Sequence, residues 1–534
     1  MFDLKKTTYE VFRESVLKFP KQPAIYYMGS LITYQAFLKT INKMAACYKK
    51  LNIKQGDTIT ILAPNTPEGI ASYYAASQLG IKASLLHPLS KEERIKEDIK
   101  QKGSKLLVTA SMFLCDNPGL LNSGFPILAI EVKTSLPAIS RLAYPYLYKN
   151  DNFAFDMHPE VIRFAKCREE YAGYVHYDNC EGRVYLASGG TSGKEKSIIL
   201  SDYAFLSLIS TGPDILGLSE EKMAGKSMMS ALPMFHGFGL TMGIMVMLCY
   251  GGSMYLLPKY HTKDVVKALK HNHCHYMIGV PVMYEALLRN PKFSGDILKN
   301  LSIAFVGGDF IAPSLLERFN NHMRENNSEG TLYEGYGLTE TVTVLSVNTP
   351  SAHRDGSVGK PLSVVDVKII DEENNILPPN QKGEIAVAGE TLMNGYLGGE
   401  DPFVELEGRK YVKSGDIGYL DEDGFLYFIS RKKRMIKRKG FNIYPLPIEK
   451  RVTDLSSVIE AAYLSRIENG REETYLFIHL DKGSDPKKTE DEIKAIIKAE
   501  FFPYEMPDHI IMKDDFPKTK VAKIDYNALL DSLE

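Results

Sequence analysis

Short runs of apolar residues alternate along the chain with longer stretches in which apolar positions recur at helical spacing. Residues 59–63 and 82–86 are apolar runs of strand length, and residues 67–80 between them have a helical pattern that a glycine closes. Because short apolar strands separated by helices are typical of βαβ units, we expect a parallel sheet in this region.

The same alternation returns downstream and extends the prediction to most of the chain. Further apolar runs predict strands, and the amphipathic stretches between them predict helices. The predicted strands are residues 184–187, 253–257, 276–279 and 303–306, and the predicted helices are residues 262–272 and 313–326. The pattern therefore indicates the α/β class, with a large N-terminal domain of helix-flanked sheets.

The pattern changes after about residue 363, where strand-like pieces become shorter and turn residues more frequent. This change predicts a small β-rich lobe over about 363–432, followed by a small α+β domain. The predicted elements are strands 367–370 and 384–387 in the lobe, then helices 446–453 and 489–501 with strands 458–464 and 475–480. We therefore expect two domains, 1–432 and 433–534.

Length and charge limit the possible functions. A chain of 534 residues exceeds the size at which one core keeps growing, which agrees with more than one domain. The formal net charge of −2 gives no overall attraction to nucleic acid or to an anionic membrane, so any charge-driven binding must be local. We therefore expect no nucleic-acid partner.

Targeting signals are also missing from the pattern. The charged residues 1–10 lack the apolar stretch of a signal peptide. The most apolar stretch, 238–250, is shorter than the ~20 residues of a membrane span, so we expect a buried core helix there and no transmembrane segment. The cysteines form no CxxC pair, which favours reduced core residues of a cytoplasmic protein. They are Cys47, Cys115, Cys167, Cys180, Cys249 and Cys274.

A glycine-rich segment follows the predicted strand 184–187. It reads Ser188-Gly189-Gly190-Thr191-Ser192-Gly193-Lys194-Glu195-Lys196. Exposed backbone N–H groups and hydroxyls in such a loop can surround phosphate oxygens. It is not a Walker A loop, since Ser188 stands where the first glycine is required and Glu195 stands at the Mg²⁺-binding position. Taken alone, the segment could also be a flexible surface turn.

Two later segments could complete a nucleotide site. The first is Tyr333-Glu334-Gly335-Tyr336-Gly337-Leu338-Thr339-Glu340-Thr341, which combines glycines, an aromatic ring that can stack on a base, and oxygen ligands for Mg²⁺. The second is Ser414-Gly415-Asp416-Ile417-Gly418, in which a carboxylate between glycines could accept both hydroxyls of a ribose. In isolation, the first could be a strand end with a turn and the second an Asp-Gly turn.

In this order, the three segments resemble the adenylate-forming superfamily, which comprises acyl-CoA synthetases, luciferases and the adenylation domains of peptide synthetases. The resemblance covers nearly the whole chain, from residues 56–88 to Pro517-Lys518-Thr519-Lys520-Val521-Ala522-Lys523. Several motifs in the same order are far more specific than one glycine-rich match. The resemblance implies ATP, Mg²⁺ and coenzyme A as cofactors, and a C-terminal domain that is mobile.

The resemblance also implies a role for each motif. The loop 188–196 would hold the β- and γ-phosphates of ATP, Tyr336 would stack on adenine, and Thr339 would contact the α-phosphate. Glu340 would hold Mg²⁺, and Lys523 would be the adenylation lysine. Other residues expected around ATP are Gly308, Asp309, Glu334, Gly335 and Gly337, with Asp416 and Arg431 on the ribose. An acid at position 309 would favour a polar or cationic substrate, unless it faces solvent or hydrogen-bonds adenine.

A run of cations, Arg431-Lys432-Lys433-Arg434-Met435-Ile436-Lys437-Arg438-Lys439, precedes Gly440 and by itself predicts a nuclear-localisation or nucleic-acid patch. By the resemblance this run is the hinge between domains, with Lys433 at the hinge position. Gly440, with Lys439 and Phe441 beside it, would line the coenzyme A tunnel. The alternative for Lys432, Arg434 and Arg438 is a solvated basic face.

Two histidine-containing segments remain. Leu232-Pro233-Met234-Phe235-His236 resembles a family motif that borders the acyl carboxylate and the thiol path, so His236 is a candidate catalytic residue. A lone histidine beside phenylalanine is more often a core residue, which stays the alternative. Residues 271–275 hold three histidines and Cys274, but alternate side chains would point to opposite faces, so we expect no metal site there.

Together these observations predict an AMP-forming acyl-CoA synthetase, an acid–thiol ligase of fatty acid metabolism. The segment 334–340 is more similar to acyl-CoA ligases than to peptide-synthetase domains, which favour Asn-x-Tyr-Gly-Pro. One alternative is a stand-alone enzyme that loads an acyl or amino acid onto the pantetheine of a carrier protein. Two others are a nucleotide-binding regulatory protein with an inactive ligase fold and an RNA-binding protein. A homodimer stays open.

Overall fold

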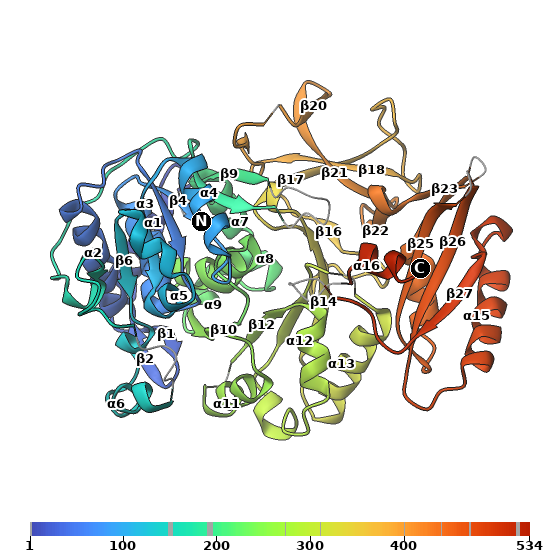
Figure 1. The fold of residues 1–534 in the computed structure, drawn as a ribbon, viewed down its shortest axis with the longest axis horizontal. Helices are drawn as coiled ribbons and strands as arrows, with labels where there is room; N and C mark the ends of the chain where they lie inside the picture. The colour runs from blue at the N-terminus through green and yellow to red at the C-terminus, as the bar shows by residue number, and fades with distance from the viewer. Residues whose placement is uncertain are drawn as a thin grey trace.

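The computed structural model describes residues 3–147, 153–188, 196–272, 274–309, 311–399, 401–438, 441–468, 471–518 and 524–533. Figure 1 shows helix-flanked sheets at the left and centre, a β-rich lobe above them, and a smaller domain of strands and helices at the right, toward the C-terminus. This arrangement confirms the predicted α/β class, with a β-rich lobe and a C-terminal α+β part.

The first sheet is largely parallel, and its central strands are apolar on both faces, as is usual for a parallel sheet covered by helices. Every residue of β3 (Thr58–Leu62) is buried, as expected for a strand that helices cover on both sides. Strands β3, β4 and β8 confirm the strands predicted at residues 59–63, 82–86 and 184–187. The order across the sheet is β19 (Gly395–Tyr396), β9 (Ser197–Ser201), β8 (Gly182–Ala187), β4 (Lys82–Leu85), β3, β5 (Ser104–Ala110), β6 (Ile127–Ile130) and β7 (Ile162–Arg163).

The second sheet holds the strand that carries most of the candidate site. Its strand β14 runs parallel to β13, whereas β15 returns antiparallel to β14. Strands β12 and β13 have the predicted bounds. The order is β16 (Lys360–Pro361), β15 (Val344–Val347), β14 (Thr331–Gly337), β13 (Ile303–Val306), β12 (Tyr276–Gly279), β10 (Ser227–Ser230), β11 (Ser253–Leu256), β1 (Pro23–Tyr27) and β2 (Ser30–Thr33).

Helices cover both sheets where the pattern predicts them. The helix predicted at 67–80 begins after Thr66, whose hydroxyl accepts a hydrogen bond from Gly69 N–H, and ends before Gly80, which has φ +64°. The helices of this part are α1 (Thr8–Lys18), α2 (Tyr34–Lys50), α3 (Pro67–Gln78), α4 (Glu92–Lys102), α5 (Ser111–Asp116), α6 (Ala138–Leu147), α7 (Asp202–Ser210), α8 (Gly212–Ile215), α9 (Glu220–Met223), α11 (Thr262–Asn272), α12 (Pro281–Leu288) and α13 (Pro313–Glu325).

The most apolar stretch is a buried helical segment, as predicted, but its first part has an unexpected geometry. Phe238–Met245 is a π-helix, and it continues as α10 (Val246–Cys249), whose residues are all buried. Such π-turns are frequent at functional sites, and this one begins two residues after His236. Over the described part of the chain, no helix is long and apolar enough to cross a membrane.

The lobe and the C-terminal part are built from antiparallel pairs with local cores. In the C-terminal part, one apolar cluster includes Ile448 and Leu476 and a second includes Phe477 and Leu529. The lobe strands are β17 (Val365–Ile370), β18 (Gly383–Gly389), β20 (Phe403–Leu406), β21 (Arg409–Leu420) and β22 (Leu426–Arg431). The C-terminal elements are β23 (Ile436–Arg438), β24 (Phe441–Ile443), α14 (Pro445–Thr453), β25 (Val458–Glu468), β26 (Arg471–Leu480), α15 (Pro486–Glu500), β27 (His509–Lys513) and α16 (Tyr526–Asp531).

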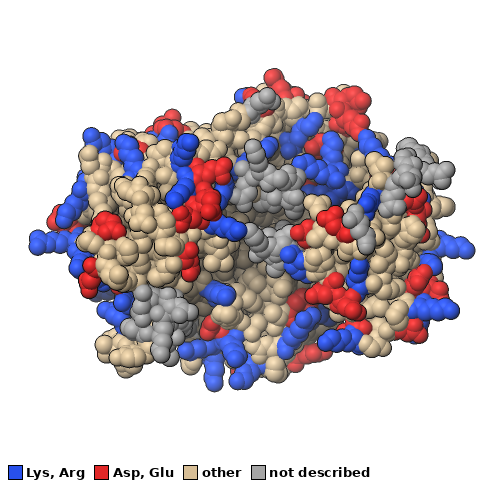
Figure 2. Space-filling model, in the orientation of Figure 1, with Lys and Arg blue, Asp and Glu red and all other residues tan. Residues whose placement is uncertain are grey.

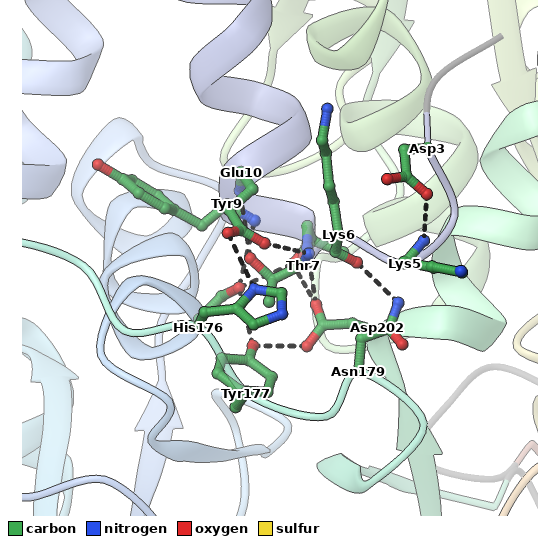
Figure 3. A network of polar contacts seen from close by, with 12 residues as sticks. Asp3, Lys5, Lys6, Thr7, Tyr9, Glu10, His176, Tyr177, Asn179 and Asp202 are labelled. Carbon is green, nitrogen blue, oxygen red and sulfur yellow. Dashed lines mark hydrogen bonds and ion pairs between the residues drawn. The ribbon is translucent and has the colours of Figure 1, made fainter.

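A buried polar network joins the N-terminal segment to the first residue of α7 (Figure 3). Asp202 Oδ1 accepts hydrogen bonds from the N–H (3.0 Å) and the hydroxyl (2.5 Å) of Thr8, and Oδ2 accepts one from Tyr177 (2.6 Å). Burial raises the pKa of Asp202, and these hydrogen bonds oppose that shift. Because Tyr177 precedes β8 and Asp202 follows β9, the network anchors the strand pair from which the segment 188–196 projects.

The cysteines differ from the prediction. Cys47 and Cys167 form a disulfide that links α2 to the segment after β7, across a separation of 120 residues. Cys249 and Cys274 are buried free thiols, whereas Cys115 and Cys180 are exposed. The expectation of reduced core cysteines is therefore wrong for four of the six, because the burial of a cysteine and its partner depend on contacts far apart in the sequence.

Candidate functional site

The tight turn after β14 fixes the positions of Thr339 and Glu340. Gly337 allows this turn, since a Cβ added there would lie 1.7 Å from the carbonyl oxygen of Thr343. Val342 has φ 66° and ψ −59°, and Thr343 N–H donates to the Thr341 carbonyl at 2.8 Å. This is a γ-turn of the strained hand on a buried β-branched residue. Such strain is typical of functional sites.

At one end of the site, Tyr336 and Asp416 are hydrogen-bonded. The Tyr336 hydroxyl donates to Asp416 Oδ2 at 2.5 Å, and Asp416 Oδ1 lies 3.0 Å from Nη1 of Arg431, which pairs with it across β21 and β22. Asp416 is fully buried, and burial raises its pKa to about 6 while the Arg431 charge opposes the shift. Oδ1 has no aligned hydrogen bond among the described residues. It can therefore accept one from a ribose hydroxyl.

At the other end of the site, Tyr396 links Glu340 to Lys196, the last residue of the segment 188–196. Oε1 of Glu340 accepts a hydrogen bond from Tyr396 at 2.9 Å, and the ammonium of Lys196 lies 4.3 Å from the centre of the Tyr396 ring. Ser188 closes the loop, because its N–H donates to the Lys196 carbonyl (2.9 Å) and its hydroxyl accepts from Lys196 N–H (3.0 Å). Glu340 also contributes to the raised pKa of Asp416, so the two ends are electrostatically coupled.

Several predicted phosphate-loop and C-terminal residues cannot be placed. Gly189, Gly190, Thr191, Ser192 and Gly193 lie outside the described residues, as do Lys439, Gly440 and Lys523. Their expected roles stay predictions.

Asn65 holds the His236 segment against the site. Its amide donates to the Leu232 carbonyl at 2.8 Å and accepts from Met234 N–H at 2.9 Å. A Cβ at Gly237 would lie 1.8 Å from the Val342 carbonyl oxygen, so this segment touches the strained turn directly. His236 itself is exposed, which excludes the core-residue alternative and leaves its ring accessible to a substrate.

The predicted glycines after β13 bring backbone close to β14. A Cβ at Gly307 would lie 2.9 Å from the Gly335 carbonyl oxygen, and Gly308 has φ +80°. A side chain at Gly307 would therefore push the two strand ends apart, and one at Gly308 would be strained by its positive φ. Asp309, which follows, is exposed. Its side chain therefore faces outward and does not enter the apolar interior.

The C-terminal part approaches the site through α14, which packs against β22, and through α16, which Figure 1 shows close to β22. Burial raises the pKa of Tyr526, three residues after Lys523, to about 12, and Asp309 is among the charges that add to the shift. Burial also raises the pKa of Glu334 to about 7, against the opposing charge of Lys450 in α14. The strand that carries Tyr336 therefore faces the C-terminal part of the chain.

Comparison with known proteins identifies the family. A family model described as AMP-binding enzyme matches residues 12–397. The chain belongs to the AMP-binding enzymes. A long-chain-fatty-acid–CoA ligase of Bacillus subtilis is 27% identical, over 98% of this chain and 94% of its own. A 4-coumarate–CoA ligase of Arabidopsis thaliana is 23% identical, over 95% of this chain and 87% of its own.

Solved structures with the same fold include two CoA ligases. An anthranilate CoA ligase in complex with anthranoyl-AMP has a TM-score of 0.82 at 18% identity, covering 99% of this chain and 98% of the other. A benzoate CoA ligase from Burkholderia xenovorans has a TM-score of 0.81 at 18% identity, covering 99% and 100%. At this level of identity, the likeness shows that the AMP-binding enzyme shares their fold over nearly its whole length.

The basic run of this AMP-binding enzyme is largely neutralised by carboxylates. The alternative of a solvated basic face does not hold for Lys432, Arg434 and Arg438, because each is partly buried and forms an ion pair with a carboxylate. A nucleic-acid patch requires cations that face solvent, so these pairs remove most of the basis for that alternative. The pairs are Arg431–Asp416, Lys432–Glu384, Arg434–Glu449, Lys437–Glu372 and Arg438–Asp508.

The donor set at Glu340 fits a magnesium ion that is shared with substrate phosphates. Mg²⁺ is usually held by one or two carboxylates together with phosphate oxygens and water. Glu340 is partly exposed, and Tyr396 connects it to Lys196 at the end of the 188–196 segment. The 271–275 segment has no comparable set among its described residues, since His275 hydrogen-bonds Ser227 and the Cys274 thiol donates to a backbone carbonyl.

Two residues that support the site were not predicted. Tyr396 joins Glu340 to Lys196, and Asn65 positions the His236 segment. Asn65 lies in a stretch covered by the resemblance, but nothing in its neighbours indicates a partner 167 residues away. Tyr396 follows glycine in a two-residue strand, which gives no periodic signal.

Proposed function

We propose that this AMP-binding enzyme is an ATP-dependent acid–thiol ligase, an AMP-forming acyl-CoA synthetase. It activates a carboxylic acid as acyl-AMP with release of pyrophosphate, and then transfers the acyl group to coenzyme A. The observation that supports this most is the arrangement of β14, whose Tyr336 reaches the Asp416–Arg431 pair, while the turn after it places Glu340 beside Tyr396, whose ring contacts Lys196. Ribose-binding and phosphate-binding groups are thereby set at the two ends of one short segment.

The reaction brings two anions together, so the site must neutralise both before the carboxylate oxygen can attack the α-phosphorus in line. Bound Mg²⁺ would supply positive charge on the phosphates, and Glu340 would hold it. Lys196 adds positive charge at the same end, while Thr339 would donate a hydrogen bond to the α-phosphate. Asp416 and Arg431 would fix the ribose, so that the reacting phosphorus faces the His236 segment.

Lys523 would lie between the carboxylate and the α-phosphate during the first half-reaction. Tyr526, three residues later at the start of α16, is partly buried where the charge of Asp309 reaches it. A lysine on a mobile domain also accounts for the second half-reaction, because withdrawing it leaves room for a thiol. The domain boundary near residue 433, with Lys433 as the hinge, belongs to this proposal.

The residues around the His236 segment favour an apolar acid as the substrate, and we propose a long-chain fatty acid. The π-helix Phe238–Met245, which follows His236, has buried apolar side chains. Asp309, in the segment after β13, is exposed, so its carboxylate does not enter the apolar region around this helix. The curated relatives named as long-chain-fatty-acid–CoA ligases support the same class. Coenzyme A is the proposed acceptor, and Lys439, Gly440 and Phe441 would line its path. A carrier-protein pantetheine is the alternative.

The decisive assay measures ATP-dependent pyrophosphate release across a panel of acids, from short to long and from aliphatic to aromatic. Each acid is tested alone, with coenzyme A and with an acyl carrier protein, and the thioester is detected by mass. We expect release with long-chain acids and a coenzyme A thioester as product. A thioester formed solely on the carrier protein would support the alternative acceptor, and no ATP consumption with any acid would refute the proposal.

Lys523→Ala separates the two half-reactions. It should abolish formation of the acyl-adenylate and leave thiolysis of a supplied acyl-adenylate largely intact. Lys520→Ala, which removes the same charge three residues earlier in the sequence, is the matched control and should retain both steps. Equal loss of both steps in Lys523→Ala would contradict the assigned role.

A further inference from the structure

Helix α6 turns an apolar face to solvent. Ile139, Leu142 and Tyr146 are 84%, 77% and 79% exposed, and their spacing of three and four residues places them on one side of the helix. Tyr144, between them in sequence, is 7% exposed and turns toward the protein. A helix of ordinary surface character has the opposite arrangement, with its apolar side inward.

The turn between β1 and β2 extends this apolar surface. A Cβ at Gly29 would lie 3.6 Å from the Pro137 ring, which directly precedes α6, so the turn and the helix are in contact. Met28 and Leu31 on either side of the turn are also exposed. Figure 1 shows α6 beside β2 at the lower left. We call this surface the α6 edge, and its residues are Met28, Leu31, Ile139, Leu142 and Tyr146.

A row of lysines projects from the same edge of the second sheet. Lys263, Lys267 and Lys270 recur at helical spacing on α11, they are exposed, and they form no ion pair with any residue that the structure describes. Strands β1 and β11 are parallel neighbours, with Tyr27 opposite Leu256. The β1–β2 turn and the segment leading to α11 therefore leave the sheet at the same edge. Asp264 is the one acid within α11.

Figures 1 and 2 agree with this placement. In Figure 1, α6 and α11 both lie along the lower edge of the molecule, and Figure 2 shows lysine and arginine side chains gathered along that edge beside an uncharged projection. A compact apolar projection beside these lysines matches a surface that has an apolar interior and anionic groups at its boundary with water. That is the structure of the headgroup region of an acidic lipid bilayer.

We propose that the α6 edge docks this protein on the surface of an anionic lipid bilayer. Ile139, Leu142 and Tyr146 enter the headgroup boundary, and the α11 lysines contact anionic headgroups. The ten residues of α6 are too few to span a membrane, so the helix lies in the plane of the interface. The net charge of −2 leaves this local row as the source of attraction, so binding depends on these particular lysines.

The test is flotation of the full-length protein with vesicles of phosphatidylcholine alone and of phosphatidylcholine with about a quarter phosphatidylserine. We expect the protein to float with the anionic vesicles and to be released as salt is raised, because the lysine contribution is screened. Equal flotation with both vesicle types, or none with either, would overturn the proposal.

Two triple variants separate the apolar and cationic contributions. Changing Ile139, Leu142 and Tyr146 to Ser, or Lys263, Lys267 and Lys270 to Gln, should each weaken binding to anionic vesicles by on the order of 100-fold. All six side chains are exposed, so both variants should melt at the temperature of the unchanged protein. The matched control changes Lys482, Lys487 and Lys498, which are exposed in the C-terminal part around α15, to Gln and should bind normally.

Self-association is the competing use of the same face. Light scattering distinguishes it, since the proposal expects the Ser triple variant and the unchanged protein to have the same mass in solution. A dimer that the Ser substitutions dissociate would assign the α6 edge to a second copy of the chain and overturn membrane docking. Loss of vesicle binding in the α15 control would also refute it, because the effect would then come from overall charge.

Discussion

Glu68 is a buried carboxyl group at the start of α3 that the proposed reaction does not use. Ser135 donates a hydrogen bond to Oε1 at 2.6 Å, while buried Oε2 has no hydrogen-bond partner among the described residues. Burial raises the pKa of Glu68 from 4.5 to about 7, and the Ser135 hydrogen bond opposes the shift. A folded-state pKa above the unfolded value means that the protonated form stabilises the fold, and this contribution is lost as the pH rises through about 7.

Glu68→Gln should therefore change stability in a pH-dependent direction. At about pH 4, below the unfolded pKa of 4.5, the variant should melt like the unchanged protein, since both side chains are then largely neutral in the folded and the unfolded state. At about pH 8 the variant should be more stable by about 3 kcal/mol, because it avoids a buried charge. The midpoint of thermal unfolding, followed at both pH values, measures the difference. A variant that is less stable at the higher pH would contradict the assignment.

Val342 offers a test of backbone strain at the candidate site. At an ordinary position, glycine is less stable than alanine by about 1 kcal/mol, because it loses more backbone entropy. At φ 66° the order should reverse, so that Val342→Gly unfolds at a higher denaturant concentration than Val342→Ala. The same pair at Val344, in β15, is the control and should show the ordinary order. The ordinary order at both positions would mean that the turn is not strained.

Asp416 should make nucleotide binding pH-dependent. Its carboxylate form accepts hydrogen bonds from ribose hydroxyls, and its pKa is raised to about 6 by burial. Affinity for adenosine monophosphate should therefore fall as the pH drops below about 6, more steeply than in Asp416→Asn. At neutral pH the Asn variant should bind on the order of 10-fold to 100-fold more weakly. Titration calorimetry at several pH values measures both effects, and parallel pH profiles would exclude a ribose contact.

At the scale of elements, prediction from the sequence succeeds where the signal is local. Strands β12 and β13 and helix α11 have the predicted bounds, because each is a continuous apolar run or an amphipathic period with clear ends. The helical character of 238–250 was predicted, but its π-geometry was not. Side-chain periodicity does not distinguish a π-turn from an α-turn when every position is buried.

The candidate site could be predicted in part for the same reason. Tyr336, Glu340 and Asp416 lie in short motifs, and the structure brings Tyr336 and Asp416 into contact. Asn65, Tyr396 and the Cys47–Cys167 disulfide depend on partners that lie 167, 56 and 120 residues away. Contacts of that separation follow from how the sheets stack, which no local pattern contains.

Asn65 belongs to this element scale, because it joins the loop before α3 to the His236 segment. Asn65→Ala removes both hydrogen bonds to that segment, so the KM for the acid should rise and kcat for adenylation should fall, by about 10-fold each. Asn65→Asp keeps an acceptor for Met234 N–H and should lose less. The affinity for ATP should stay unchanged in both variants. A change confined to ATP affinity would contradict a positioning role toward the acid.

At the scale of the whole molecule, the proposed reaction requires the C-terminal part to move away from the nucleotide site after adenylation and to return to it for the next cycle. We call the arrangement with this part against the site the closed arrangement. Glu334 on β14 and Lys450 on α14 are both partly buried where the two parts meet. Burial raises the pKa of Glu334 and lowers that of Lys450, and the charge of each partner opposes the shift. A pair of this kind contributes little net stability, because desolvation offsets most of the attraction. It is therefore suited to a contact that must open in every cycle.

Removing one partner should disfavour the closed arrangement, since the other charge is then buried without compensation. Lys450→Ala should slow pyrophosphate release by about 10-fold while thiolysis of a supplied acyl-adenylate is unchanged or faster. Adding Glu334→Gln should restore much of the lost rate, because the uncompensated charge is removed. Arg451→Ala is the control, since its partners Glu500 and Asp454 both lie in the C-terminal part. If the double variant were slower than Lys450→Ala, the pair would not govern closure.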